Sequence, residues 1–263
     1  MPAHLLLGKT SADQILRQIK HKLSKTKQKP CLAVILVGQN HSSVAYIRIK
    51  ERACQRVGIK FQKHFLPTNA STNQLIKLIK KINRDNKIQG LIVQLPLPKN
   101  IKTHLVTAAI SPKKDLDGFV VNSNFISPVY QGVFFLIKRS KIKLAQKKAI
   151  ILANSQIFAQ PLQKMFQRKG VAISAIVLPK QKLLTPIKKA DIIITALGQA
   201  HFLKPKMIKS GCLIIDVGFS RLNHKLAGDV DPRCAQRAGH LSPVPGGIGP
   251  LTVAFLLKNL IKK

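Results

Sequence analysis

Residues 31–66 read CLAVILVGQNHSSVAYIRIKERACQRVGIKFQKHFL and contain the pattern that decides the fold class. Residues 31–37 are uniformly apolar and are followed by glycine, which predicts a buried strand. Residues 42–57 place apolar side chains at helical spacing and end at Gly58, the residue type favoured just past a helix C-terminus. Residues 59–66 predict a second strand. A strand, a helix and a further strand in this order are typical of a parallel α/β sheet.

The same alternation of short aliphatic runs and amphipathic stretches continues on both sides of this segment. It predicts further helices over residues 11–25, 72–82, 161–168 and 251–261, and further strands over 90–95, 148–153, 171–178, 191–197 and 212–217. The pattern restarts after the Asp117-Gly118 pair. We therefore expect two α/β lobes, of which the second has the element order of a nucleotide-binding lobe.

The composition is that of a folded chain with an aliphatic core. The 263 residues are 45% hydrophobic but only 5% aromatic, and no apolar run approaches the roughly 20 residues that a membrane helix needs. The first residues do not resemble a secretory signal, so a cytoplasmic protein is expected. Four scattered cysteines without a CxxC pair and eight dispersed histidines argue against disulfides and against a metal site.

The net charge is the unusual feature of the composition. Forty-five basic residues against nine acidic ones give +36. Such a charge is compatible with nucleic-acid binding, because phosphate neutralisation releases counterions. The basic residues are spread along the chain without basic tails or Gly/Arg repeats, which favours a general compositional bias over a specific nucleic-acid surface. The resulting field would still attract anionic small molecules.

A few polar residues stand at positions where chemistry is expected. Tyr46 and Lys50 are four apart on a predicted helix and share one face. If burial or neighbouring positive charge lowers the lysine pKa, the pair can move protons; otherwise it is a solvated lysine beside a tyrosine. Gln94 ends a predicted strand, where ligands of α/β sheets collect. Asp115 and Asp117 either accept hydrogen bonds from a ligand or form a turn.

These signals occur in the order found in one known family. The chain resembles bifunctional methylenetetrahydrofolate dehydrogenase/cyclohydrolases (the FolD family) over nearly its whole length. The strings that carry the resemblance are Ser43-x-x-Tyr46-x-x-x-Lys50, VQLPLP (93–98), KDLDGF (114–119), IDVG (215–218), GDV (228–230) and PVPGGIGPLT (243–252).

The resemblance implies an N-terminal folate domain, residues 1–118 with the returning helix 251–263, and a Rossmann-like NADP-binding domain, residues 119–250, with a cleft between them. It implies oxidation of 5,10-methylenetetrahydrofolate with NADP and hydrolysis of the product to 10-formyltetrahydrofolate. These reactions of one-carbon metabolism supply purine, histidine and methionine biosynthesis. A homodimer is also implied.

The resemblance also implies roles for individual residues. Lys50 would be the acid/base, Gln94 would tune its ionisation, Tyr46 would position the folate, and Asp117 would bind the pterin. The other implied contacts are Pro98, Gly246 and Gly247 for the folate, and Ala153, Asn154, Ser155 and Phe219 for NADP.

The sequence departs from the family at the expected cofactor turn. The family pattern G-x-S-x-x-V-G-x-P reads ANSQIFAQP at residues 153–161, so Ala153 and Ala159 replace two glycines. Each added Cβ could clash with the cofactor or forbid a positive φ, and restoring glycine would then tighten NADP binding. Lys180 or Lys182 stands where a ribose-phosphate contact is expected. NADP binding with reduced affinity, a cyclohydrolase without dehydrogenase activity and a non-catalytic protein all remain open.

Two other protein classes were compared with this interpretation. Short-chain dehydrogenases also contain Tyr-x-x-x-Lys, but their glycine-rich nucleotide lobe precedes the pair, and nothing glycine-rich precedes it here. A basic nucleic-acid-binding protein would bind nucleic acid with an affinity that falls steeply with salt, and would have little saturable affinity for folates.

Asp229 and Asp231 are interpreted as turn residues.

Overall fold

The chain forms two compact units, each with its own sheet. The computed structural model describes residues 2–120, 122–177, 184–223 and 225–262. The three-stranded unit comprises Ala12–Gln131 and Thr252–Lys263, and the six-stranded unit comprises Met1–Ser11 and Gly132–Leu251. The predicted α/β class with parallel sheets is confirmed. Residues from Thr252 onward belong with the first lobe, as expected of a returning helix.

The three-stranded unit is built on a fully buried central strand. Strand β2 (Cys31–Val37) pairs in parallel with β3 (Lys60–Leu66) on one side and β4 (Gly90–Val93) on the other. All seven residues of β2 are buried. Burial of each large aliphatic side chain contributes about 1.5–3 kcal/mol. The packing of this sheet therefore holds the ends of its strands rigidly.

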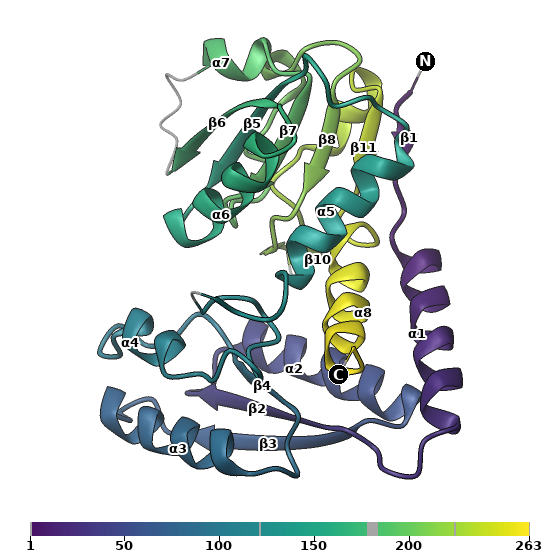
Figure 1. Cartoon of the computed structure of the whole chain (residues 1–263). Coiled ribbons are helices and arrows are strands. Elements are labelled where there is room, and N and C mark those ends of the chain that lie inside the picture. The colour runs from purple at the N-terminus through teal and green to yellow at the C-terminus, as the bar shows by residue number, and fades with distance from the viewer. Residues whose placement is uncertain (1, 121, 178–183, 224, 263) are drawn as a thin grey trace. The chain divides into compact units, whose positions relative to one another are not determined.

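Helices cover both faces of this sheet. Figure 1 shows α2 (His41–Val57) and α3 (Thr72–Arg84) on opposite sides of it. Asn40 caps the start of α2 by accepting a hydrogen bond from the Ser43 backbone N–H. Gly58 ends the helix at φ 80°, as its position in the sequence predicts. The remaining helices with residues in this unit are α1 (Lys9–Ser24), α4 (Thr103–Ala108), the start of α5 (Pro128–Arg139) and most of α8 (Ile248–Leu260).

The six-stranded unit has a parallel sheet of Rossmann-like order, β1-β11-β8-β7-β5-β6. Its strands are β1 (His4–Leu5), β5 (Lys148–Ala153), β6 (Ala172–Val177), β7 (Ile192–Ala196), β8 (Leu213–Asp216) and β11 (His240–Ser242). Along the chain β5 is followed by β6 on one side and then by β7 on the other, which creates a switch point between β5 and β7. Ligands of such sheets bind at the carboxyl ends of the strands beside this point.

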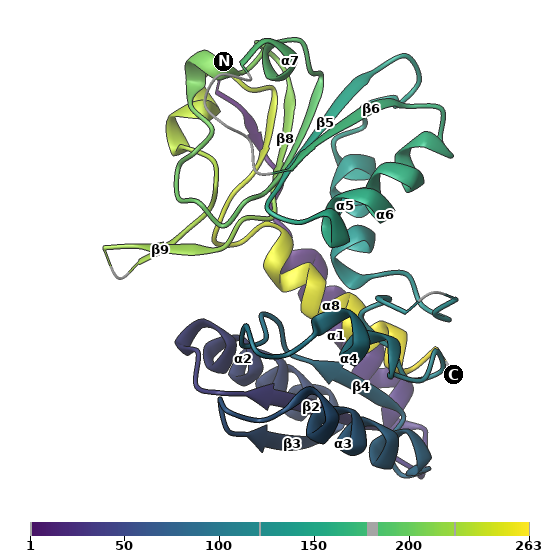
Figure 2. The ribbon, with the colours of Figure 1, turned by 90° about the vertical axis from the view of Figure 1, so that its left-hand side faces the viewer.

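Short elements complete the six-stranded unit. In Figure 2, α5 and α6 (Gln156–Gln167) lie on the same side of its sheet, and the β9–β10 hairpin (Ser220–Leu222 and Lys225–Ala227) extends away from it. The other helical elements are α7 (Leu184–Lys188), η1 (Pro205–Met207) and η2 (Pro232–Gln236). Strand β1 pairs with β11, which explains why the first eleven residues join this unit.

Several predicted boundaries differ from those of the structure. The strand expected over 90–95 ends at Val93, before the Pro96 turn. The helix expected from residue 161 begins at Gln156, because Ser155 caps it by accepting the Ile157 N–H at 3.1 Å, and Pro161 lies inside it. The helix expected over 251–261 is Ile248–Leu260 and therefore begins three residues earlier.

No helix in the part of the chain that the structure describes is long and apolar enough to cross a membrane.

Candidate active site

A pocket of about 170 Å³ in the three-stranded unit brings together all four of the predicted catalytic residues. Those residues are Tyr46, Lys50, Gln94 and Asp117. The rest of the lining is mostly apolar, from Ile92, Val93, Leu95, Phe119, Pro128 and Val129, with Ser127 and Thr252. Pockets for whole small-molecule ligands are typically 300–1,000 Å³. This pocket therefore suits one ring system of a larger ligand.

Lys50 is a buried charged residue of the pocket. It lies on α2 with 5% of its surface exposed, and its Nζ donates a hydrogen bond to Gln94 Oε1 at 2.9 Å. The Gln94 amide is itself oriented, because its Nε2 donates to the Leu95 carbonyl at 2.8 Å. The amide oxygen is thereby aimed at the amine. Gln94 is held at the end of β4 by its backbone N–H, which donates to the Ile35 carbonyl of β2 at 2.9 Å.

Tyr46 lies one helical turn before Lys50, as the spacing predicts. The Lys50 Nζ is 4.9 Å from the centroid of its ring. The phenol is hydrogen-bonded to Thr252. Burial is the main cause that raises the pKa of Tyr46 to about 12, and the Asp117 charge adds to it. The phenol therefore stays protonated at neutral pH and can donate a hydrogen bond.

The amine and the carboxyl group in this pocket have pKa values that move toward each other. Burial lowers the pKa of Lys50, and the negative charge of Asp117 partly opposes that effect. Burial raises the pKa of Asp117, and the positive charge of Lys50 partly opposes it. Burial, rather than neighbouring positive charge, is thus what favours a neutral Lys50 amine. Such an amine can accept and return a proton closer to neutral pH than an exposed lysine can.

Thr252 is a pocket residue that the sequence analysis did not single out. It lines the pocket and is hydrogen-bonded to Tyr46, more than 200 positions earlier in the chain. The only signal for it was its place at the end of the PVPGGIGPLT string. A single hydroxyl within an apolar helix carries no periodic signal of its own.

The remaining residues expected to contact folate lie outside this pocket lining. Pro98 belongs to the loop after β4, where its carbonyl accepts a hydrogen bond from the Ile101 N–H at 3.0 Å. Gly246 and Gly247 form a tight turn of the six-stranded unit, with Gly246 at φ 104°. A Cβ on Gly247 would lie 2.2 Å from Ser242 Oγ, so only glycine fits there.

The expected cofactor residues lie at the carboxyl edge of the six-stranded sheet. The Asn154 backbone N–H donates to the Ala196 carbonyl at 3.1 Å, and its Nδ2 donates to the Leu197 carbonyl at 3.2 Å. Asn154 thereby joins the ends of β5 and β7 at the switch point. Ser155 follows it and caps α6. A strand, a tight turn and a helix N-terminus at a switch point form a phosphate-binding arrangement, so this edge fits a dinucleotide.

The positive φ considered for residues 153 and 159 is not found in the structure. Ala153 is the last residue of β5 and Ala159 lies inside α6, and neither has a positive φ. Both side chains are completely buried. Their methyl groups therefore lie within the protein, and the backbone does not require glycine at either position.

Phe219, the fourth predicted cofactor residue, follows β8 with 40% of its surface exposed. Its carbonyl and the Asn154 Nδ2 both lie within 4 Å of the position that a Cβ on Gly198 would occupy. The loops after β5, β7 and β8 therefore meet around Gly198. Lys180 and Lys182, the predicted ribose-phosphate contacts, lie outside the described residues.

Buried carboxylates hold these loops in place. Asp229 accepts hydrogen bonds from the Leu197 and Gln199 N–H groups at 2.6 and 2.8 Å. Asp216 accepts bonds from the Gly218, Asp229 and Val230 N–H groups, and burial raises its pKa to about 6. Asp229 thus holds the loop after β7 in place. Asp231 caps η2, which fits its interpretation as a turn residue.

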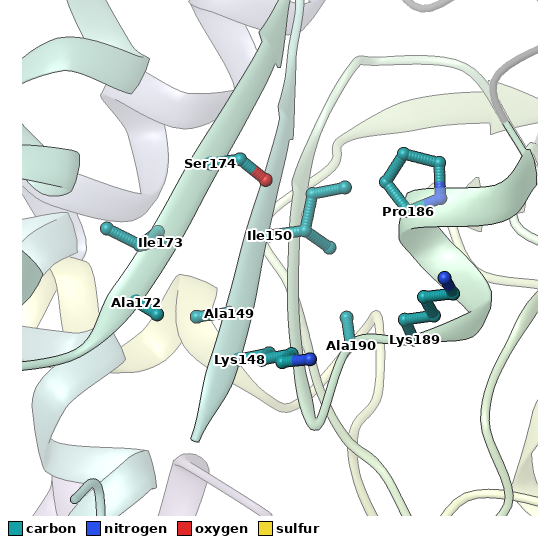
Figure 3. A pocket seen from close by; sticks show the side chains of 9 residues that line it. All are labelled: Lys148, Ala149, Ile150, Ala172, Ile173, Ser174, Pro186, Lys189 and Ala190. Atoms are coloured by element: carbon teal, nitrogen blue, oxygen red, sulfur yellow. The ribbon is translucent and has the colours of Figure 1, made fainter. Parts of the chain in front are cut away.

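A second pocket, of about 360 Å³, lies at the other end of the six-stranded sheet. Figure 3 shows residues from the first halves of β5 and β6 on one side of it and Pro186 and Lys189 on the other. Its polar side chains are Lys148, Ser174 and Lys189. It contains none of the residues singled out from the sequence, so the smaller pocket is the better candidate for chemistry.

The comparisons with known proteins agree with this geometry. The family model for the tetrahydrofolate dehydrogenase/cyclohydrolase catalytic domain matches residues 6–117, and that for the NAD(P)-binding domain matches residues 127–263. The chain is 38% identical to the bifunctional protein FolD of Moorella thermoacetica over 276 residues, which cover 100% of this chain and 99% of that protein. It is also 38% identical to the FolD protein of Campylobacter hominis over 272 residues, with 98% and 96% covered.

Two solved structures are similar over the whole chain. The bifunctional enzyme FolD from Campylobacter jejuni has a TM-score of 0.91 at 36% identity, with 99% of this chain and 98% of that chain covered. The Trypanosoma brucei FolD, described as a complex with NADP cofactor and inhibitor, has a TM-score of 0.92 at 25% identity, with 99% and 97% covered.

Proposed function

Because the chain belongs to the tetrahydrofolate dehydrogenase/cyclohydrolase family, we propose that it oxidises 5,10-methylenetetrahydrofolate with NADP and hydrolyses the methenyl product to 10-formyltetrahydrofolate. The observation that carries the proposal is the buried Lys50 amine, 2.9 Å from the oriented Gln94 amide and beside a protonated Tyr46. Full-length relatives at 38% identity support both activities.

Lys50 is assigned the proton transfers of the hydrolysis. Water that attacks the methenyl carbon must lose a proton, and the ring nitrogen that leaves must gain one. A neutral amine accepts the first proton and the resulting ammonium donates the second. Gln94 accepts a hydrogen bond from the amine and keeps it aimed into the pocket. The apolar lining limits access of bulk water to the reacting carbon.

The other assigned roles concern binding. Tyr46 can stack on the folate ring and donate a hydrogen bond, and Asp117 can accept bonds from the N–H groups of the pterin. NADP, when bound, accepts the hydride from the methylene carbon. Asn154, Ser155 and the N-terminus of α6 are assigned to its phosphates, with Ala153 and Phe219 beside them. Pro98, Gly246 and Gly247 are assigned to the walls of the folate site.

Residues 1–118 with 251–263 are proposed as the folate domain and 119–250 as the NADP-binding domain. The compact units of the structure differ from these bounds, because residues up to Ser11 belong to the six-stranded unit and residues 119–131 belong to the three-stranded unit. The two family matches, over 6–117 and 127–263, support a boundary in this region.

The experiment that tests the function is a spectrophotometric assay of the purified protein with methylene- and methenyl-tetrahydrofolate, with and without NADP or NAD. We expect oxidation that depends on NADP and hydrolysis that does not. Hydrolysis alone would support a cyclohydrolase without dehydrogenase activity. Absence of both activities, together with salt-sensitive binding to nucleic acid and no saturable folate binding, would refute the proposal in favour of the nucleic-acid alternative.

Replacement of Ala153 and Ala159 together by glycine is expected to leave the Kd for NADP unchanged within about twofold. The two methyl groups are buried and the backbone has no positive φ at either position. A glycine inside α6 should lower the stability of that helix by about 1 kcal/mol. A calorimetric titration with NADP and a thermal melt measure the two effects. Tenfold tighter binding in the double variant would show that the methyl groups do crowd the cofactor.

We also propose a homodimer that acts in the cytoplasm. Among the described residues β3 pairs only with β2, so its outer edge is open. Its Phe65 side chain is 63% exposed. A seven-residue open edge with an exposed aromatic side chain is suited to a second copy of the chain. The four cysteines are free and buried, which fits a reducing compartment. Light scattering that gives the mass of a single chain would rule out the dimer.

A further inference from the structure

Helix α8 carries a buried carboxamide for which the proposed reaction has no use. Asn259 lies seven residues after Thr252 and therefore on the same face of the helix, about two turns further on. Its side chain is only 1% exposed. Asparagine is rarely buried unless its polar atoms are bonded, so its partners indicate what it does.

Those partners are backbone groups of the loop that contains Asp117. The Asn259 Nδ2 donates hydrogen bonds to the carbonyls of Leu116 and Ile126, both at 3.1 Å. Its Oδ1 accepts a bond from Gln131 Nε2 at 2.9 Å. Gln131 also donates to the Ile126 carbonyl at 2.8 Å. The carboxamide is thus fixed in orientation and ties the two ends of the loop together.

The Leu116 carbonyl belongs to the peptide plane that also contains the Asp117 N–H. On the other side, the Gly118 N–H shares a peptide plane with the Asp117 carbonyl, and it donates to Asp115 Oδ1 at 3.1 Å. The two peptide planes that flank Asp117 are therefore held independently, one by Asn259 and one by Asp115. With both planes fixed, the backbone φ and ψ of Asp117 are fixed as well.

We propose that Asn259 is a positioning residue that sets the direction of the Asp117 carboxylate for recognition of the pterin. The inference rests on the proposed function, because it concerns the binding of folate. Leucine at this position would leave the Leu116 carbonyl without its buried partner and free that peptide plane to rotate. Misplacement of a binding group by about 1 Å can cost as much as 100-fold in activity. The loss falls on folate binding, because the hydrogen bonds that Asn259 donates go to the loop that carries Asp117.

The first experiment compares Asn259→Leu with a matched control, Gln89→Leu. Gln89 is also a carboxamide that bridges two backbone segments of the same unit, since it accepts from the Cys31 N–H and donates to the Asn86 carbonyl, both at 2.8 Å. It precedes β4, at the end of the strand away from Gln94. Asn259→Leu should raise the KM for methylenetetrahydrofolate about tenfold or more and leave the Kd for NADP within twofold. Gln89→Leu should lower the melting temperature without a change in KM.

The second experiment separates positioning from a general loss of stability. If Asn259 acts through Asp117, Asn259→Leu should raise KM at most twofold further in an Asp117→Asn background. Equal fold-changes in the two backgrounds would overturn the inference. Gln131→Leu removes the support of the Asn259 amide and one of the two hydrogen bonds to the Ile126 carbonyl, but keeps the bond from Asn259 to Leu116. It is a milder variant should Asn259→Leu not fold, and it should raise KM about threefold. An unchanged KM in Gln131→Leu would equally contradict it.

The unmodified protein distinguishes failure of this inference from failure of the function. A wild-type protein that turns over folate, with KM unchanged in Asn259→Leu, refutes the positioning role alone. A wild-type protein that neither binds nor turns over folate refutes the function and this inference with it.

Discussion

Replacement of Lys50 by methionine is expected to slow hydrolysis of methenyltetrahydrofolate by roughly 10²–10⁴-fold, the usual contribution of a positioned acid/base. Methionine has a similar length but no ionisable group, so it removes the proton transfer and preserves the packing. The amine is 5% exposed, and its burial as an ammonium is unfavourable. The melting temperature should therefore stay the same or rise. The rate is measured as the decrease in absorbance of methenyltetrahydrofolate when this compound is the only substrate present.

The control for this variant is Lys80→Met, which removes an exposed lysine of α3 in the same unit. It makes the same change in net charge and should hydrolyse the substrate at the wild-type rate. Both variants should bind NADP as the wild type does, because Asn154 and Ser155 belong to the other unit. Undiminished hydrolysis in Lys50→Met would remove Lys50 from the mechanism.

Three of the pocket residues that the sequence predicted are placed by local patterns along the chain. Tyr46 and Lys50 are related by helical spacing, and Gln94 follows a short aliphatic run that predicted a strand end. Local periodicity determines such relations, and the parallel order of the strands brings them together. The central strand over 31–37 was predicted to the residue, because seven consecutive apolar side chains suit only a position buried on both faces.

The relations that the sequence did not predict depend on distant parts of the chain. Thr252 and Asn259 act on groups more than 130 positions away, and no pattern along the helix marks them. The two-residue strand β1 exists only because β11 offers an edge with which it can pair. The sequence places the start of α6 too late, because proline is favoured at the first helical position, whereas in the structure Ser155 supplies the cap and Pro161 lies inside the helix.

The structure partly explains the strongly positive net charge of the chain. Four of the nine acidic residues are buried, and these are Asp115, Asp216, Asp229 and Asp231. Each accepts hydrogen bonds from backbone N–H groups. The acidic residues retained in this basic chain are thus concentrated where a loop or a helix start needs an acceptor. The surface is left with little negative charge, which favours the approach of anionic ligands such as folates and NADP.

Replacement of Asp117 by asparagine is expected to raise the KM for methylenetetrahydrofolate roughly 10- to 100-fold, since hydrogen bonds to a charged group contribute about 1.5–3 kcal/mol. The variant should also change the pH dependence of hydrolysis. The negative charge of Asp117 raises the pKa of Lys50, in opposition to burial. Without that charge the Lys50 pKa falls further, so the amine becomes neutral at a lower pH. The limb of the kcat profile that requires the neutral amine should therefore move to lower pH.

The matched control for that shift is Asp13→Asn, which removes the same charge from an exposed ion pair with Arg56 in the same unit. Its KM and its pH profile should match those of the wild type. A shift caused by the overall charge of the protein would be present in both variants, whereas a shift caused by the Lys50–Asp117 pair is confined to Asp117→Asn. A limb that moves to higher pH in Asp117→Asn would mean that the carboxylate does not stabilise the ammonium. The assignment of this pair as coupled proton-transfer and binding groups would then be wrong.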